Sequence, residues 1–363
     1  MADQVAEANS AQHQADGRHR SRDLRVVKVI VETDDASSFV LEPPAGDDAF
    51  TQYRPGQYLT VKVPSEQTGS VARCYSLSSA PHDPAELMVT VKRTESGYAS
   101  NWLCDNVVSG TMLTVLPPSG RFVPDSLDSD LLLFAGGSGI TPLYSIVRSV
   151  LAKGAGAITL FYANRHERSV IFARQIDELM RRHPDRLEVI HWLESVQGLP
   201  DAGAIRELAG RRGGHQAFVC GPTPFMDGVT EALQAAGMAH RQIHREVFAS
   251  LSGNPFEESG RPAVATGIVD KQCGVPTEVE LDGETHKVLW PRDRTLVDVL
   301  RAKGVDVPFL CLEGKCGSCQ AVLEEGNVSM RRNEIFDDQD VAEGYVLTCQ
   351  AVPEGDGPIR VVF

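Results

Sequence analysis

The chain has 363 residues, of which 42% are hydrophobic and 23% are charged. This composition is ordinary for a globular protein, and the length predicts two or three domains with cores of their own. The formal net charge of −14 argues against a nucleic-acid-binding protein, because neutralising phosphates requires clustered lysine and arginine.

The N-terminal residues 1–22 carry mixed charges and no apolar stretch, so we interpret them as a disordered leader and not as a signal peptide. No apolar run approaches the ~20 residues that a membrane-spanning helix needs. Eight cysteines without a secretory signal indicate a reducing compartment. The sequence therefore predicts a cytoplasmic protein without a membrane span.

Residues 23–125 predict an antiparallel β-barrel, because short segments rich in valine, leucine and threonine alternate with Pro-Gly and Ser-Gly turns. The expected strands include 24–32, 57–64, 87–93 and 112–116. Residues 126–250 alternate buried apolar strands with helices, which is typical of a doubly wound parallel α/β sheet. The strands expected there are 131–134, 157–162, 187–193 and 216–220, and the helices are 143–151, 171–182 and 225–236.

Residues 251–262 combine glycine, proline, serine and glutamate and are the best linker candidate. Residues 263–363 then form a third unit, for which we expect a smaller α+β domain of the β-grasp type. It begins with a hairpin-like stretch at 277–289 and a helix at 296–302. A long loop follows, and it holds three cysteines.

Four cysteines of the third unit give the strongest signal in the sequence. Cys311, Cys316 and Cys319 follow the spacing C-x4-C-x2-C, and Cys349 lies thirty residues further on. This is the spacing of plant-type [2Fe–2S] ferredoxins, in which one loop delivers three thiolates and a distant segment the fourth. A zinc site is the alternative, but zinc knuckles usually have two residues in the first gap. Cys273 has no partner at a useful spacing, and we expect it to serve packing.

Residues 73–76 (RCYS) suggest a flavin site in the barrel. Arg73 can bind a phosphate, Tyr75 can lie against an isoalloxazine ring, and Ser76 can hydrogen-bond its reactive edge. The strand containing Val89 and Val91 offers an edge for the ring. Gly97 and Ser100 can open a short helix whose N–H groups face a diphosphate, although Ser100 also fits a plain helix cap.

Glycines after the first parallel strand suggest a nucleotide site. Gly136, Gly137, Ser138 and Gly139 lead into a helix, where a diphosphate can approach the backbone closely. The stretch is not G-x-G-x-x-G, so the usual dinucleotide fingerprint is absent. Thr141 has a hydroxyl that could reach a nicotinamide or a flavin.

Further candidates lie at the ends of later strands. Arg165 and Ser169, with Arg168 nearby, are plausible phosphate contacts or equally solvated surface residues. A second group of candidates is Cys220, Gly221 and Pro222. Gly221 would let a nicotinamide approach closely. Glu246 and Phe248 place a carboxylate and an aromatic ring where two cofactors would meet. We take Ser76, Thr141, Cys220 and Glu246 as the candidate catalytic residues.

The pieces RCYS, GYAS, GGSGITP, YANR, CGP and EVF, in this order, resemble the ferredoxin-reductase superfamily. With its C-terminal ferredoxin-like unit, the chain is similar to reductase components of bacterial oxygenases over everything after residue 22. The stretches TGSVARCYSLSSAP, VTVKRTESGYASNWL and YANRHERSVIF, with HWLESVQGLP, most resemble reductases of 3-ketosteroid 9α-hydroxylases in steroid degradation. Phenylacetyl-CoA epoxidase reductases have the same domain order.

The resemblance implies an NAD(P)H-dependent oxidoreductase with an electron route from NADH through FAD and a [2Fe–2S] cluster to a Rieske-type terminal oxygenase. A hydride passes to the flavin, which then releases electrons singly. NADPH stays open because Arg165 and Arg168 could accept a 2′-phosphate, and FAD is preferred to FMN by resemblance only. Another oxygenase partner, or a stand-alone NAD(P)H oxidoreductase, are the alternatives.

Two observations bear on the partner. No Cys-x-His pair occurs in the sequence, so a Rieske centre must lie on another polypeptide. Residues 263–363 contain 18 acidic and 10 basic residues, a net charge of −8, and include the acidic run Asp337, Asp338, Asp340 and Glu343. Such runs are usually solvated surface. As a hypothesis, this face docks a basic patch on the oxygenase.

Overall fold

The computed structural model describes residues 21–363 except 44, 84–85, 211–214, 249 and 257–273. The described chain divides into two compact units. One contains residues 22–65 and 73–248, and the other contains residues 66–72 and the C-terminal part from residue 250 onward. Residues 1–20 of the predicted leader, residues 257–262 of the predicted linker and Cys273 lie outside the described residues.

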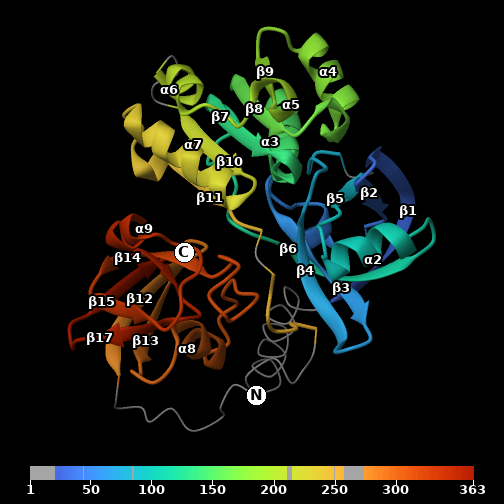
Figure 1. Cartoon of the computed structure of the whole chain (residues 1–363). Coiled ribbons are helices and arrows are strands. Elements are labelled where there is room, and N and C mark those ends of the chain that lie inside the picture. Colours follow the sequence, from blue (N-terminus) through green and yellow to red (C-terminus); the bar gives the residue numbers. More distant parts are fainter. Residues whose placement is uncertain (1–20, 44, 84–85, 211–214, 249, 257–273) are drawn as a thin grey trace. The chain divides into compact units, whose positions relative to one another are not determined.

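Six antiparallel strands form the predicted barrel (Figure 1). They are β1 (Arg22–Thr33), β2 (Ala36–Leu41), β3 (Tyr58–Ser65), β4 (Gly69–Ser76), β5 (Leu87–Lys92) and β6 (Met112–Ser119), in the spatial order β4-β3-β6-β1-β2-β5. A bridge between Leu77 and Val89 joins the two ends of this order and closes the sheet. The 3-10 helix η1 (Asp48–Phe50) lies between β2 and β3, and α2 (Tyr98–Asn106) packs against β3 and β5.

The second sheet is parallel and has the spatial order β11-β10-β7-β8-β9. Its strands are β7 (Leu131–Gly136), β8 (Ile158–Asn164), β9 (Leu187–Leu193), β10 (Gln216–Cys220) and β11 (Ile243–Glu246). The chain proceeds from β7 outward to β9 and then returns to the other side of β7. The strand order therefore reverses between β7 and β10, which is where doubly wound sheets form a crevice at their carboxyl ends.

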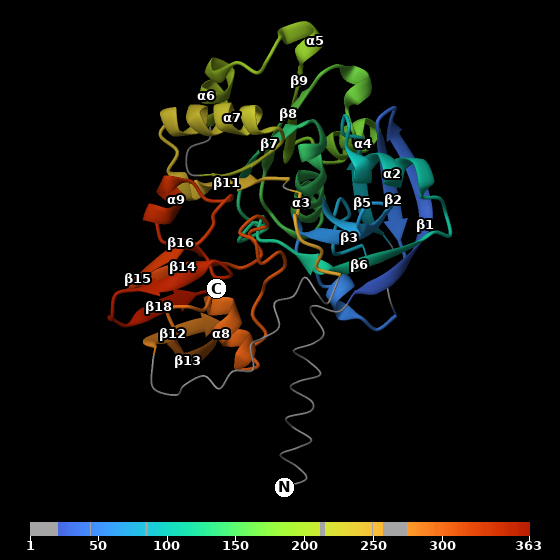
Figure 2. The same ribbon diagram turned by 60° about the horizontal axis from the view of Figure 1, so that its bottom comes forward.

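Helices cover both faces of this sheet (Figures 1 and 2). Leu131, Leu133 and Ala135 of β7 face a core that includes α3 (Ile140–Lys153) and α4 (Ala173–Arg182). The alternate residues Leu132 and Phe134 face α6 (Ala202–Gly210) and α7 (Thr223–Ala235). This burial on two sides explains why the strand is apolar at every position. The short elements between them are η2 (Gly137–Gly139), η3 (Glu167–Ser169), α5 (Glu194–Gln197) and η4 (His240–Gln242).

Two of these helices begin earlier than the sequence pattern predicts. Helix α3 begins at Ile140 instead of residue 143, and α7 begins at Thr223 instead of residue 225. The expected starts fall just after Pro142 and Pro224. Proline is tolerated in the first turn, where its missing N–H has no intrahelical partner to lose, so both helices extend back through it.

The barrel, apart from residues 66–72, belongs to the same compact unit as the parallel sheet. Ser145 of α3 donates its hydroxyl to the carbonyl of Ser79 at 2.5 Å. Arg148, one turn further along α3, forms ion pairs with Glu86 at 2.6 Å and Asp83 at 3.3 Å. The helix that follows the glycine loop is therefore fixed directly to the barrel.

The C-terminal domain has a five-stranded sheet in the order β13-β12-β18-β14-β16. Its elements are β12 (Val275–Leu281), β13 (Glu284–Trp290), α8 (Leu296–Ala302), β14 (Gln320–Glu325), β15 (Asn327–Met330), α9 (Asp338–Ala342), β16 (Tyr345–Leu347), β17 (Ala351–Glu354) and β18 (Ile359–Val362). Helix α8 buries Leu296 and Leu300 in the core that also contains Trp290. Sheet and helix form the α+β arrangement that the sequence predicts. In the described part of the chain, no helix is long and apolar enough to cross a membrane.

Candidate cofactor sites

The four cysteines predicted as metal ligands lie together in the C-terminal domain. The sulfur of Cys311 is in hydrogen-bonding contact with the thiols of Cys316 and Cys349, and Cys349 also contacts Cys319. The backbone N–H of Glu313 points at the Cys311 sulfur at 3.3 Å. Hydrogen bonds from Cys316 and Cys349 hold the pKa of the Cys311 thiol far below its usual range. The same hydrogen bonds, together with burial, raise the pKa of the Cys316 and Cys349 thiols, so these sulfurs interact closely with one another.

The backbone of the ligand loop is curled tightly. Leu312, Gly314 and Gly317 all have left-handed conformations, with φ of +56°, +75° and +69°. A Cβ on Gly314 would lie 2.6 Å from the carbonyl oxygen of Arg332, so only glycine fits there. Gln350 fastens the loop by donating to the Leu312 carbonyl at 2.8 Å. Four thiols with inward-pointing N–H groups are a donor set that fits a [2Fe–2S] cluster.

The residues predicted to hold a flavin lie at the junction where the barrel closes. Ser76 is the last residue of β4 and is buried, and Val89 and Val91 are buried in β5, which the Leu77–Val89 bridge brings alongside. Burial raises the pKa of the Tyr75 phenol above its usual value, and the nearby Arg73 partly opposes this. A cationic side chain and a half-buried phenol therefore share one strand, as binding a phosphate and an aromatic ring requires.

Helix α2 starts at the position expected for a diphosphate. Gly97 is its N-cap, and a Cβ there would lie 2.8 Å from Cβ of Thr94. Ser100 is buried, and its hydroxyl oxygen accepts the N–H of Thr94 at 3.1 Å. The Ser100 oxygen thus stabilises the turn before the helix, and its contact with a phosphate stays a prediction.

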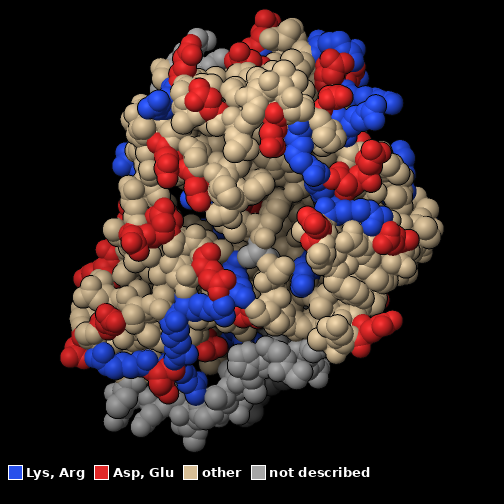
Figure 3. Space-filling model, in the orientation of Figure 1, with Lys and Arg blue, Asp and Glu red and all other residues tan. Residues whose placement is uncertain are grey.

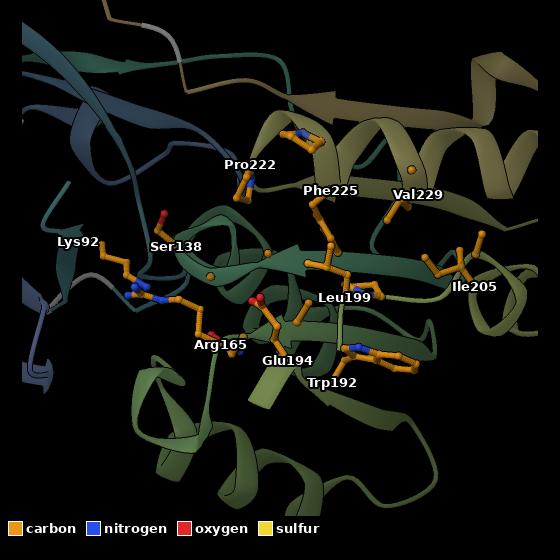
Figure 4. Close-up of a pocket in the computed structure, with 18 residues that line it drawn as sticks. Lys92, Ser138, Arg165, Trp192, Glu194, Leu199, Ile205, Pro222, Phe225 and Val229 are labelled. Carbon is orange, nitrogen blue, oxygen red and sulfur yellow. The ribbon is translucent and has the colours of Figure 1, made fainter. Parts of the chain in front are cut away.

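A cavity of about 540 Å³ opens along the carboxyl ends of the parallel strands (Figure 4). Of the residues predicted for the nucleotide, five line it: Gly136, Gly137, Ser138, Arg165 and Pro222. Figure 4 shows Lys92, Ser138 and Arg165 at one end and Trp192, Ile205 and Val229 at the other, with Glu194 between them. One end is therefore polar and the other is apolar and aromatic, which suits the phosphate-and-base character of a nucleotide.

Four other predicted residues are not among the residues that line this cavity: Gly139, Thr141, Ser169 and Gly221. Thr141 donates its hydroxyl to the Ser138 carbonyl at 3.0 Å. Ser169 donates to the His166 carbonyl at 2.7 Å and accepts the N–H of the same residue at 3.2 Å. Both hydroxyls stabilise the loops that carry them, and their direct contact with a nucleotide stays a prediction.

Gly139 lets the loop after β7 contact the loop after β10 at the switch point, where the strand order reverses. A Cβ on Gly139 would lie 2.0 Å from the carbonyl oxygen of Cys220. Gly221, with φ of +159°, would place a Cβ 2.9 Å from Cα of Gly136. The glycine loop after β7 and the loop after β10 are thus in backbone contact, and this contact shapes the floor of the crevice.

An aspartate that pairs with two residues at the polar end of the cavity was not predicted from the sequence. Asp35, in the turn between β1 and β2, forms an ion pair with Arg165 at 3.0 Å and approaches the Lys92 ammonium at 3.6 Å. Burial lowers the pKa of Lys92, and Asp35 opposes that shift. The pairing joins the barrel to the end of β8. Nothing local in the sequence marks an aspartate in a turn as a partner of an arginine 130 residues away.

Glu194 and Trp192 were also missed as site residues. Both lie at the carboxyl end of β9, next to the strand that carries Arg165. The Trp192 ring N–H donates to the Gly198 carbonyl at 2.9 Å, which fixes the ring at the cavity wall. The doubly wound topology is the signal that could have found them, because neighbouring parallel strands end at the same edge.

Cys220 and Glu246 lie opposite each other on β10 and β11, as expected for residues that end adjacent parallel strands. Burial raises the pKa of the Glu246 carboxyl to about 8 and raises that of the Cys220 thiol well above its usual value. Both groups therefore hold their protons at neutral pH. Phe248, two residues beyond, is 47% exposed.

Replacing Glu246 by glutamine is expected to flatten the pH dependence of stability. The folded protein binds the Glu246 proton more tightly than the unfolded chain, whose carboxyl has its ordinary pKa of 4.5. The resulting stabilisation is complete below pH 4.5 and is lost as the pH rises through about 8. Calorimetric Tm values measured across this window should fall less in Glu246→Gln than in the unmodified protein. Parallel Tm profiles would show that the carboxyl is not buried in its neutral form.

Comparison with known proteins identifies all three domains. Residues 23–123 match the oxidoreductase FAD-binding domain, residues 133–231 the oxidoreductase NAD-binding domain, and residues 279–354 the 2Fe-2S iron-sulfur cluster binding domain. These matches confirm the predicted cofactor classes and favour a [2Fe–2S] cluster over zinc at the four cysteines. The matched ranges fall inside the predicted domains, whose boundaries at 125, 250 and 263 stay predictions.

Several proteins match this chain over nearly their whole length. The ferredoxin reductase component of 3-ketosteroid-9-alpha-monooxygenase from Rhodococcus rhodochrous is 51% identical over 93% of this chain and 95% of its own. A component of 1,2-phenylacetyl-CoA epoxidase from Escherichia coli (strain K12) is 32% identical over 91% and 94%. The structure of phthalate dioxygenase reductase, at 24% identity, superposes with a TM-score of 0.55 over 94% and 98%. The chain belongs to the family of ferredoxin-reductase-type oxidoreductases that join FAD-binding, NAD-binding and [2Fe–2S] domains in the reductase component of a monooxygenase.

Proposed function

We propose that this chain delivers electrons from NADH to the Rieske-type terminal oxygenase of a 3-ketosteroid 9α-monooxygenase. The observation that carries this proposal is its similarity to the Rhodococcus rhodochrous reductase component, which extends over all three domains at about half identity. The epoxidase component has the same domain order but shares far fewer residues. Domain order alone thus leaves the partner open, and identity favours the steroid system.

In this proposal the protein holds FAD, the nucleotide and the cluster and orients them for electron transfer. FAD supplies the conversion between the two-electron chemistry of the nicotinamide and the one-electron chemistry of the cluster. Arg73 and Tyr75 hold the flavin, and the glycine loop after β7 holds the nucleotide. Glu246, neutral at pH 7, keeps a proton at the end of β11. The four thiolates hold the cluster.

The partner is tested by reconstitution with purified oxygenase components. We expect NADH-driven 9α-hydroxylation of a 3-ketosteroid when the chain is combined with the oxygenase of that system. With the oxygenase of phenylacetyl-CoA epoxidase, NADH should be consumed without matching product. The two oxygenases are compared by the ratio of product formed to NADH oxidised. Their amounts are first adjusted so that each gives equal activity with its own reductase. A higher ratio of product to oxidised NADH with the epoxidase oxygenase than with the steroid oxygenase would overturn the proposal.

The acidic C-terminal domain is proposed to dock the oxygenase. Asp337 accepts the N–H groups of Gln339 and Asp340 and so caps α9, which accounts for part of the acidic run. Asp338 and Glu343 are exposed on the same short helix and its end. Acidic and basic side chains are interspersed on the face seen in Figure 3. Docking through charge predicts that product formation in the reconstitution falls as salt is raised, while NADH–ferricyanide activity does not.

The charges around the cavity favour NADH over NADPH. A 2′-phosphate at the polar end would have to compete with Asp35 for Arg165 and would meet the carboxylate of Glu194 in the same cavity. Replacing Glu194 by glutamine should raise kcat/KM for NADPH relative to NADH by about tenfold, or ~1.4 kcal/mol. Steady-state kinetics with both nucleotides measure the ratio, with Glu231→Gln on the exposed face of α7 as the control.

Replacing Arg165 by alanine separates two roles for the same cavity. If Arg165 binds a 2′-phosphate, NADPH is weakened far more than NADH. If it contacts the diphosphate or ribose, both nucleotides are weakened equally. An unchanged NADPH preference in Glu194→Gln, together with equal losses in Arg165→Ala, would show that this end of the cavity does not discriminate between them.

A further inference from the structure

The loop that carries the cluster cysteines also holds a segment of the interdomain linker. Glu313 stands between Cys311 and Cys316 in the sequence. Its carboxylate accepts two consecutive backbone N–H groups of the linker. Ser252 donates to its Oε2 at 3.0 Å, and Gly253 donates to its Oε1. All of these residues belong to the same compact unit. Two adjacent amides converging on one carboxylate form a specific anion site in the backbone.

Lys315 completes this contact from the other side of the loop. Its side chain is only 11% exposed, lies 3.9 Å from the Glu313 carboxylate, and donates to the Ser252 hydroxyl. Both charged residues of the stretch CLEGKC therefore contact the linker. A Cβ on Gly253 would lie 2.4 Å from Oε1 of Glu313, so alanine here would displace the carboxylate from the two amides while leaving the backbone in place.

The next linker residue is held as well. Asn254 donates its side-chain amide to the carbonyl of Ser70 at 3.2 Å and to the Ser70 hydroxyl at 2.7 Å. Leu251, on the other side, is buried. Residues 251–254 are thus fixed by burial, charge and hydrogen bonds, although their glycine- and serine-rich sequence is typical of a free linker.

This contact changes the length of chain on which the cluster domain is tethered. Residues 249–274 separate Phe248 from β12, but only residues 249–251 separate Phe248 from the segment that Glu313 holds. An extended chain spans at most ~3.3–3.6 Å per residue, so about 10 Å of chain separates Phe248 from the cluster loop with the contact made. Without it, residues 255–274, beyond the Asn254 contact with Ser70, can span about 70 Å.

We propose that Glu313 and Lys315 are positioning residues that latch the cluster loop to Ser252 and Gly253 and so keep the [2Fe–2S] cluster within short reach of the reductase unit. The inference rests on the family's electron transfer from FAD to the cluster and is independent of the steroid partner. Effective concentration falls roughly as the −3/2 power of tether length, so releasing the latch slows flavin-to-cluster transfer by about tenfold or more.

The test breaks the latch from each side. Glu313→Ala removes the acceptor from the cluster loop, and Gly253→Ala blocks the linker without touching that loop. Glu324→Ala, which removes an exposed carboxylate from β14 in the same domain, is the matched control. Hydrogen exchange of the Ser252 and Gly253 amides reports the latch itself, and we expect it to accelerate in Glu313→Ala and not in the control.

Stopped-flow absorbance of the holoprotein reports the consequence. Reduction of the flavin by NADH should keep its rate in all variants, and the later reduction of the cluster should slow about tenfold in both latch variants. The double variant should be no slower than the slower single variant, because both remove one contact. The EPR spectrum of the reduced cluster should not change.

Two results would overturn the latch. One is slow exchange of the Ser252 and Gly253 amides in Glu313→Ala together with an unchanged rate of cluster reduction. The other is slower transfer in Glu313→Ala alone, with Gly253→Ala at the original rate, which would mean that the carboxylate acts on the cluster. If Glu313→Ala fails to retain iron, Gly253→Ala still decides the question, because its cluster loop is intact.

Discussion

The Cys316→Ser variant is expected to lose its [2Fe–2S] cluster and to keep the reduction of ferricyanide by NADH through the flavin. Cys316 lies in the thiol group around Cys311, within the loop that has three left-handed residues. Serine supplies a hydroxyl of much higher pKa and cannot replace the thiolate. Losing a group that merely supports a metal ligand costs about 10–100-fold in metal affinity, and losing the ligand itself costs more.

Iron content, EPR of the reduced protein and two activities measure the outcome. Electron transfer through the cluster to an oxygenase or to cytochrome c should fall by two orders of magnitude or more, roughly as the cluster is lost. Cys104→Ser is the matched control, because Cys104 is a half-buried thiol of α2 that contacts the Val91 carbonyl in the other compact unit. Loss of the ferricyanide activity together with the cluster would contradict independent folding of the flavin and cluster domains.

The fold and the grouping of the cysteines could be predicted because both have signals in consecutive residues. The spacing of Cys311, Cys316 and Cys319 indicates a ligand loop without any tertiary information, and the role of these cysteines as cluster ligands stays a prediction. The helix expected at 296–302 is α8, with the same bounds. The doubly wound sheet follows from apolar strands that alternate with helices, above all β7, which is apolar at every position and so must be buried on both faces.

The polar end of the nucleotide cavity could not be predicted in the same way. Asp35, Lys92 and Glu194 come from a turn and two strand ends that only the tertiary fold brings together. The short strands β14 to β18 were missed for a similar reason. They contain three to six residues each, and pairing across the sheet, rather than their own sequence, defines them.

The roles of three hydroxyl groups could not be predicted from the motifs that contain them. Ser100, Thr141 and Ser169 were predicted to contact cofactors, and each makes a hydrogen bond with the backbone of its own loop. Serine and threonine serve both purposes with the same chemistry, because a side chain that stabilises a tight loop near a helix start is also placed close to any bound phosphate. The sequence identifies such a loop but does not distinguish the two roles.

Replacing Gly139 by alanine is expected to slow reduction of the flavin by NADH by up to roughly a hundredfold without disturbing the cluster. The added Cβ would lie 2.0 Å from the Cys220 carbonyl oxygen and 2.7 Å from the Gly221 nitrogen, so it would meet backbone atoms that have no rotamer to change. The loops after β7 and β10 must then move apart at the switch point. Overpacking a core costs about 1–3 kcal/mol, and the upper end corresponds to roughly a hundredfold in rate.

Stopped-flow reduction with NADH measures this loss, and dithionite serves as a reductant that does not need the nucleotide site. Dithionite should still reduce both flavin and cluster in Gly139→Ala. Gly210→Ala is the matched control, because a Cβ at the end of α6 would meet no atom within 4 Å. NADH reduction at the original rate in Gly139→Ala would mean that the nucleotide does not use the crevice between β7 and β10. This result would contradict the nucleotide-binding roles predicted for both loops, because the backbone contact between Gly139 and Cys220 shapes them both.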